Sequence, residues 1–210
     1  MSESAARVLR ADGLELWRGD RRLFTGVSFH LDDGELLHIV GPNGCGKTSL
    51  LRVLCGLTLP ETGEVYWEGR KIRRARADFH ASLCYLGHRE SLKADLTAEE
   101  NLHFQLGLRT WISEADVHGA LERVGLTRQR TVPARSLSAG QKRRVSLAKA
   151  LASGARLWVL DEPYTNLDVD GRALVDEMMG QHLEKGGLVL LVAHQSHGVH
   201  AGITRRLELG

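Results

Sequence analysis

The residues with the most specific chemical pattern in this chain are Gly41 to Thr48, which read Gly-Pro-Asn-Gly-Cys-Gly-Lys-Thr. They fit the pattern G-x-x-x-x-G-K-[ST], in which a glycine-rich turn and a helix start direct backbone N–H groups at phosphate. Lys47 would neutralise the terminal phosphates, and the Thr48 hydroxyl would ligate Mg²⁺. The pattern predicts a nucleoside triphosphate site. The residues expected to contact the nucleotide here are Gly41, Pro42, Asn43, Gly44, Cys45, Gly46, Lys47, Thr48 and Ser49.

Two carboxylates follow a second apolar segment, Trp158 to Leu160. In open α/β sheets, ligands bind at the carboxyl ends of the strands, so Asp161 and Glu162 are expected beside the phosphate loop. Asp161 would hold Mg²⁺, directly or through water. Glu162 would act as the base that polarises a water attacking the terminal phosphate.

These groups must be positioned by strands and helices that the hydrophobic pattern predicts. Short apolar runs indicate buried strands at 36–40, 82–86, 156–160 and 188–192, and alternation indicates strands at 13–17, 27–31, 64–67 and, at a sheet edge, 203–209. Helices are expected at 49–54, from a capping box at Thr97 to about 108, from Ser113 to about 124, from Ser138 to about 152, and at 171–183. Apolar strands that alternate with helices predict a parallel sheet covered on both faces.

The helical block at roughly 88–136 interrupts this alternation and is interpreted as an inserted helical subdomain. The whole chain, 1–210, is then one domain, with the core and β subdomain at 1–87 and 137–210.

Composition limits the possible functions. Lys plus Arg number 28 and Asp plus Glu 26, a balance that gives no argument for nucleic acid. No apolar stretch is long enough to span a membrane and no signal peptide is visible. The three cysteines form no C-x-x-C pair, which favours a reducing, cytoplasmic compartment. Five basic residues within 70–76 favour a solvated face, with a patch for lipid headgroups or an acidic partner as the alternative.

A further motif is Leu137-Ser138-Ala139-Gly140-Gln141. Physical reasoning leaves open whether Ser138 only caps a helix or also offers its hydroxyl to an anion. The pentapeptide resembles the L-S-G-G-Q signature of ATP-binding-cassette (ABC) ATPases, with Ala139 in place of a glycine. The other motifs of that superfamily appear in the same order. They are the Walker A loop at 41–48, Walker B at 157–161 with Glu162, the D-loop at 166–168 and the switch histidine at His194. An N-K-x-D motif, which a guanine-nucleotide switch would need, is absent.

The resemblance implies an α/β P-loop NTPase fold with a mostly parallel core sheet, an antiparallel β subdomain and the inserted helical subdomain. It also implies a head-to-tail homodimer that holds two ATP molecules, each between one subunit's Walker A loop and its partner's signature. His194 and Lys47 would act catalytically with Glu162. Contacts to ATP from outside Walker A would come from Ser138, Gly140, Gln141 and Asp168.

Two positions depart from the family pattern. His88 stands where the family has its Q-loop glutamine, a residue that senses Mg²⁺ and the γ-phosphate and touches the membrane subunit. The adenine-stacking position falls on Trp17 or Arg18. His197 and His200 extend His194 to H-x-x-H-x-x-H, and both are interpreted as surface residues, not metal ligands.

The segments 85–88, 96–104 and 161–171 resemble one subfamily, the small ATPases of bacterial haem-export systems used in cytochrome c maturation. Such ATPases act at the cytoplasmic face of the inner membrane with integral-membrane subunits, and their ATP hydrolysis is expected to release a haem-loaded chaperone. The alternatives are an ABC ATPase of another small-substrate exporter, a soluble cassette ATPase acting on DNA or ribosomes, and a non-hydrolysing scaffold. The soluble ATPases usually carry coiled coils or tandem cassettes, which 210 residues do not hold. Lys47, Asp161, Glu162 and His194 together disfavour the scaffold.

Overall fold

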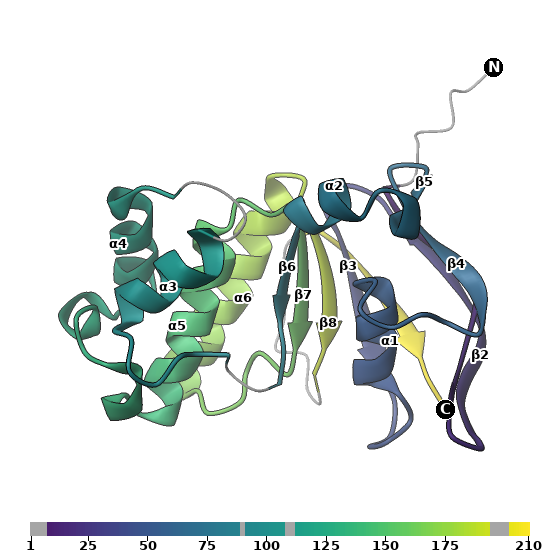
Figure 1. Cartoon of the computed structure of the whole chain (residues 1–210), viewed down its shortest axis with the longest axis horizontal. Coiled ribbons are helices and arrows are strands. Elements are labelled where there is room, and N and C mark those ends of the chain that lie inside the picture. Colours follow the sequence, from purple (N-terminus) through teal and green to yellow (C-terminus); the bar gives the residue numbers. More distant parts are fainter. Residues whose placement is uncertain (1–7, 89–90, 108–111, 194–201) are drawn as a thin grey trace.

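The computed structural model describes residues 8–88, 91–107, 112–193 and 202–210. Within them the chain forms two β-sheets and a layer of helices, with the larger sheet in the middle (Figure 1). No helix of the described residues is long and apolar enough to cross a lipid bilayer.

The larger sheet is parallel throughout. Its strand order is β6-β7-β8-β3-β9, and each neighbouring pair is parallel. The predicted α/β class with a mostly parallel core sheet is thereby confirmed, and the last strand lies at an edge as expected. The strands are β3 (Glu35–Val40), β6 (Leu83–Leu86), β7 (Leu157–Asp161), β8 (Leu188–Val192) and β9 (Ile203–Glu208).

The smaller sheet is antiparallel and lies over helix α1 (Lys47–Leu54), on one face of the parallel sheet (Figure 1). The apolar side of α1 is buried between the two sheets. A sheet in this position has one face on the core and one face toward solvent, so its strands must alternate apolar and polar residues. The strands in the first third of the chain show this alternation. The strands, in sheet order, are β2 (Arg21–Leu31), β1 (Leu9–Arg18), β4 (Thr62–Trp67) and β5 (Arg70–Lys71).

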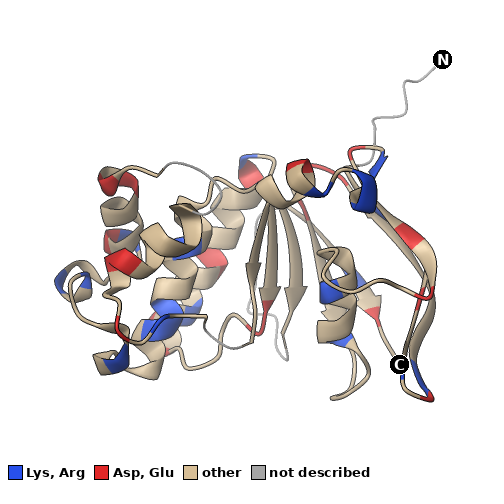
Figure 2. Cartoon of the chain, viewed as in Figure 1, with Lys and Arg blue, Asp and Glu red and all other residues tan. Residues whose placement is uncertain are grey.

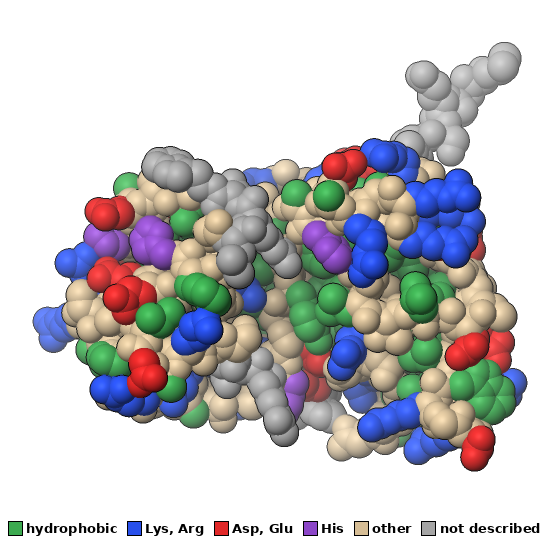
Figure 3. Space-filling model, in the orientation of Figure 1, with side chains coloured by type: hydrophobic (Ala, Val, Ile, Leu, Met, Phe, Trp, Pro, Cys, Tyr) green, Lys and Arg blue, Asp and Glu red, His purple; other side chains and the backbone are tan. Residues whose placement is uncertain are grey.

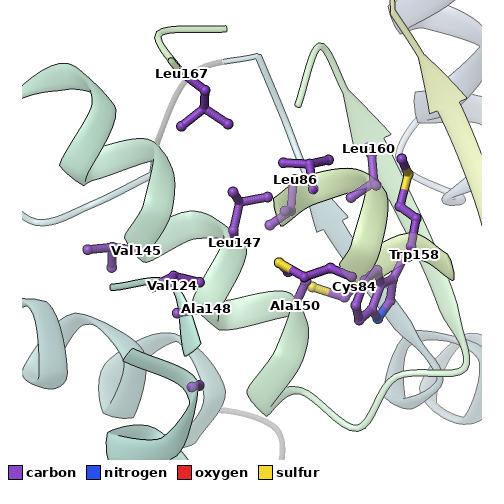
Figure 4. Close-up of a cluster of buried hydrophobic side chains, with 14 of the residues drawn as sticks. Cys84, Leu86, Val124, Val145, Leu147, Ala148, Ala150, Trp158, Leu160 and Leu167 are labelled. Atoms are coloured by element: carbon purple, nitrogen blue, oxygen red, sulfur yellow. The ribbon is translucent and has the colours of Figure 1, made fainter. Parts of the chain in front are cut away.

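Four longer helices lie on the other side of the parallel sheet (Figure 1). Side chains of α5 pack there with those of β6 and β7 in one hydrophobic cluster (Figure 4). Strand β8 shows why both faces must be covered, because Val189 and Leu191 join this cluster while Leu188 and Leu190 join the one around α1. The helices are α3 (Ala98–Gly107), α4 (Glu114–Arg123), α5 (Ala139–Ala152) and α6 (Val169–Glu184).

The helix starts follow the capping residues in the sequence. Thr97 and Glu100 bond reciprocally before α3, and the Ser113 hydroxyl accepts from the Asp116 N–H at α4. Helix α6 begins two residues earlier than predicted because the Asp168 carboxylate accepts from the Gly171 N–H and caps it.

Residues 72–81 form two short helical elements that the sequence pattern did not predict, η1 (Ile72–Arg74) and α2 (Arg76–Ala81). Their only buried side chains are Ile72 and Phe79, too few to produce a readable period. The remaining short elements are the 3₁₀ turns η2 (Thr127–Gln129) and η3 (Ala134–Ser136). The subdomain boundaries at about 88 and 136 stay a prediction, and α5, which follows the second boundary, packs on both α3 and α4.

Candidate nucleotide site

The loop between β3 and α1 is shaped by its glycines. Gly41 has a φ of 152°, and a Cβ there would lie 2.2 Å from the Leu209 carbonyl oxygen. Gly46, which caps α1, has a φ of 107°. Only glycine adopts both conformations without strain, and the loop is therefore free to turn its backbone N–H groups toward a bound anion.

A cavity of about 360 Å³ opens beside this loop. Its lining comes from several parts of the chain: the loop and the start of α1, the end of β1, the start of β2, the ends of β7 and β8, and the segments that follow β6 and β7. The lining residues are Arg18, Leu23, Asn43, Gly44, Gly46, Lys47, Thr48, Ser49, His88, Asp161, Glu162 and Val192. In Figure 1 the loop and the arrowheads of β6, β7 and β8 lie at the same lower edge of the molecule.

Of the three residues predicted at the metal site, Thr48, Asp161 and His88, the first two are in contact. The Thr48 hydroxyl donates to the Asp161 carboxylate across 3.0 Å, although the residues are far apart in sequence. Burial raises the pKa of Asp161, against the opposing effects of the Thr48 hydrogen bond and of His88, Arg143 and Lys47. A hydroxyl and a buried carboxylate are oxygen ligands of the kind that Mg²⁺ prefers, so the donor set fits this ion.

Lys47 folds back over the loop. Its Nζ donates to the carbonyl oxygens of Gly41, at 2.7 Å, and Pro42, at 3.0 Å. The ammonium group is thus held at the rim of the cavity by neutral acceptors, which the charged oxygens of a phosphate can replace with a stronger interaction.

Glu162 lines the same cavity and has an unusual backbone conformation. Its φ is 53°, in the left-handed region, and its N–H donates to the Val192 carbonyl across 2.8 Å. A glutamate in this region is uncommon and costs about 1–3 kcal/mol, which a tight turn at a functional position commonly carries. The turn directs the chain out of β7 immediately after Asp161.

A residue that the sequence analysis missed, Arg143 of α5, supports this turn from beneath. Its side chain is buried and donates to four carbonyl oxygens, those of Gly87, Asp161, Glu162 and Pro163, across 2.7–3.1 Å. The guanidinium group therefore joins α5, the helix that begins with the signature residues, to the segments at the ends of β6 and β7. A sequence signal exists, because Arg143 lies one helical turn before Leu147 on the buried side of α5, but surface arginines follow such patterns too.

The signature residues form a complete helix cap of their own. The Ser138 hydroxyl accepts from the Gln141 N–H, and the Gln141 side chain accepts from the Ser138 N–H. A Cβ on Gly140 would lie 2.9 Å from the Asn166 carbonyl oxygen, so this position favours glycine. Arg144 bonds Asp168, whose pKa is lowered by the Gly171 N–H and by that arginine. None of the signature residues is among those that line the cavity.

The other residues predicted to contact the nucleotide differ in where they lie. His88 lines the cavity and lies close enough to Asp161 to affect its pKa. Arg18 lines the cavity, whereas the Trp17 indole bonds the Glu15 side chain and is not part of the lining. His194, His197 and His200 lie outside the described residues. Among the residues that the structure describes, no cluster of three or more His, Cys, Asp or Glu side chains could hold a metal.

The fold and this cavity define a nucleoside-triphosphate-binding protein of the P-loop class. Residues 24–165, more than half of the chain, match the family model described as ABC transporter. A solved structure of an ATP-binding subunit of an ABC transporter superposes with a TM-score of 0.80 at 25% identity, covering 89% of this chain and 79% of the other. The chain is therefore an ATP-binding ATPase of the ABC transporter family.

Two sequence comparisons define its relatives more closely. The cytochrome c biogenesis ATP-binding export protein CcmA of Dechloromonas aromatica is 46% identical, over 97% of this chain and 100% of its own length. The protein with the same name from Methylococcus capsulatus is 48% identical, over 96% of this chain and 97% of its own length. The chain belongs to this family of cytochrome c biogenesis ATP-binding export proteins, which confirms the predicted resemblance.

Proposed function

We propose that this chain is the ATP-hydrolysing subunit of an exporter complex that serves c-type cytochrome biogenesis. The observation that carries the proposal is the identity of 46% with a protein named for that role, which extends over almost all of both chains. The cavity supports it, because Lys47, Asp161 and Glu162 all line it.

In this proposal the loop at 41–49 cradles the phosphates of ATP, and Lys47 balances their charge. Glu162 accepts a proton from the attacking water as the bond between the γ-phosphorus and its bridging oxygen breaks and ADP leaves. Thr48 and Asp161 would hold Mg²⁺, which supplies charge neutralisation at the phosphates when it is bound. His88 and His194 are assigned to sensing the γ-phosphate.

A homodimer completes the site. The cavity lacks the signature residues, and Ser138, Gly140 and Gln141 are instead assigned to a second subunit's ATP. Asp168 is assigned to the same contact. Arg18 is favoured over Trp17 for adenine stacking, since only Arg18 lines the cavity.

Integral-membrane subunits are the proposed partners, at the cytoplasmic face of the bacterial inner membrane. Their proposed docking place is a groove of about 510 Å³ between the parallel sheet and the helical layer. Leu83 and Tyr85 of β6 line it on one side and Leu106 of α3 on the other. Tyr85 lies three positions before His88 in the chain, which connects the groove to the nucleotide cavity. Export of haem or release of a haem-loaded chaperone is the proposed work of the complex.

The test is complementation in a bacterium whose own CcmA-type gene is deleted. The wild-type chain is expected to restore covalently attached haem in c-type cytochromes, and Lys47→Ala, expressed equally, is not. Failure of a wild-type chain that associates with the membrane subunits and hydrolyses ATP would overturn the assignment to cytochrome biogenesis while leaving the ATPase assignment intact.

A further inference from the structure

Two exposed leucines and a run of arginines lie away from the nucleotide edge of the molecule. We define the leucine–arginine face as Leu57, Leu59, Arg73, Arg74 and Arg76. Its leucines follow the end of α1, and its arginines belong to η1 and α2, at the opposite edge from the arrowheads of β6 to β8 (Figures 1 and 2). Figure 3 shows apolar and basic side chains side by side on this part of the surface.

The leucines are held in place by the way α1 ends. Gly56 has a φ of 68° and donates to the Val53 carbonyl, while the Leu57 N–H donates to the Arg52 carbonyl. This pair of bonds is the Schellman motif, in which the second residue after the helix cap commonly packs on an apolar residue in the last turn of the helix. In this chain those two positions are 57 and 52. Here position 52 is an arginine, and Leu57 remains 52% exposed. Leu59, two residues on, is 75% exposed.

The basic residues are only partly neutralised. Lys71 and Arg73 share one acid, Glu64, at 2.9 and 2.6 Å. Arg70 has Asp78 to itself. Arg74 is exposed, and Arg76 donates to a neutral group, the Gly56 carbonyl of the turn that carries the leucines. Positive charge therefore exceeds negative charge on this face, even though the chain as a whole carries only +2.

The two parts of the face meet at a cavity of about 270 Å³. Leu59 and Pro60 line it from one side and Arg73 and Arg76 from the other, over a floor that includes Phe79. Glu61 and Glu64 also line it. Apolar side chains beside guanidinium groups are the combination that binds the interface of an anionic bilayer, where apolar groups enter the headgroup boundary and cations meet phosphates.

We propose that the leucine–arginine face binds the surface of a bilayer that contains anionic phospholipid. Leu59 lines the cavity of about 270 Å³ and Leu57 lines the groove of about 510 Å³ beside β6, yet both side chains are more than half exposed, so each is free to enter a fluid headgroup layer. With two leucines and a small excess of cations, the binding is reversible and weakens as salt rises. It requires no membrane subunit and no nucleotide.

The experiment is vesicle flotation of the purified, nucleotide-free full chain. Phosphatidylcholine vesicles with and without phosphatidylglycerol are compared at low and high salt. Arg73→Glu/Arg74→Glu is matched by a control of equal charge change on other exposed residues, Arg128→Glu/Lys185→Glu. Leu59→Ser is matched by Ile203→Ser, since Ile203 is also largely exposed, at 63%.

The parent chain and both controls are expected to float with the anionic vesicles at low salt only. Binding should fall about tenfold or more in the double arginine variant, and it should fall clearly in Leu59→Ser. ATP hydrolysis, which does not use these residues, should be unchanged and reports on folding.

Three results would overturn the proposal. The first is failure of the parent to float with anionic vesicles. The second is an equal loss of binding in the control variants and the face variants, which would reduce the effect to net charge. In the third result the face variants still bind vesicles but no longer co-purify with membrane subunits, which would assign this face to a protein partner.

Discussion

Two helices begin at residues expected to bind ATP, and they begin differently. The backbone of the loop before α1 turns at glycines, and the loop lines a cavity that Asp161 and Glu162 also line. The start of α5 is closed by the reciprocal bonds of Ser138 and Gln141, and neither residue lines that cavity. One helix start thus collects its catalytic partners from within the chain, whereas the other contributes nothing to this cavity and is the part proposed to serve a second copy.

The largest expected effect tests the chemistry at the first helix start. Glu162→Gln removes the proposed base while keeping the size of the side chain, so ATP hydrolysis should fall by about 100-fold or more while ATP binding persists. An ATP-bound dimer should accumulate, visible by size-exclusion chromatography with ATP. Hydrolysis at close to the parent rate would remove Glu162 from the role of base.

A pair of variants, one at each helix start, tests whether the two helix starts serve different ATP sites. Lys47→Ala should weaken ATP binding to the isolated chain, whereas Gly140→Asp should leave ATP binding unchanged. Each variant by itself should abolish ATP hydrolysis. Mixing the two should restore hydrolysis to about a quarter of the parent value, since half of the dimers then hold one intact site of two. Equal loss of ATP affinity in the two variants would show that the signature belongs to its own chain's site.

A third variant tests the connection between the two regions. Arg143→Met leaves four carbonyl oxygens without their buried donor and should lower the free energy of unfolding by about 3–5 kcal/mol. The melting temperature should fall by at least about 6 °C. The exposed Arg128→Met is the matched control, and an unchanged melting temperature for Arg143→Met would contradict the role of this side chain.

A smaller effect is expected from the buried carboxylate of the first region. Because burial raises the pKa of Asp161, the folded state holds its proton more tightly than the unfolded state does, and this group's contribution to stability falls as pH rises through the two pKa values. Asp161→Asn should therefore be more stable than the parent at pH 7 without Mg²⁺, and this advantage should vanish in acid. Urea unfolding in EDTA at both pH values measures it, and an advantage that grows toward acid would contradict the sign.

The smallest expected effect is a labelling pattern. Cys45 lies in the phosphate loop and is partly exposed, whereas Cys55 and Cys84 are buried. An alkylating agent should modify Cys45 first, and ATP should slow the reaction by covering the loop. The two buried cysteines serve as internal controls, and modification of Cys45 at the same rate with and without ATP would place the nucleotide elsewhere.

The sequence by itself determined the elements that depend on neighbouring residues. The pattern at 41–48, the apolar run at 188–192 and the caps at Thr97 and Ser138 each act over a few positions, so their types and starts could be predicted. Segment 72–81 was not predicted because only two of its side chains, Ile72 and Phe79, are buried, and two buried positions show no helical period.

Only the tertiary structure decided which groups meet. Asp161 could be predicted beside the phosphate loop, but its hydrogen bond with Thr48, 113 residues away, could not. Arg143 donates to four carbonyls that no local pattern places near it. The same holds for Arg76, whose bond to the Gly56 carbonyl joins the arginines to the leucine turn. Such contacts depend on how the sheets and helices pack, since a side chain's period says which face is buried but not what that face will contact.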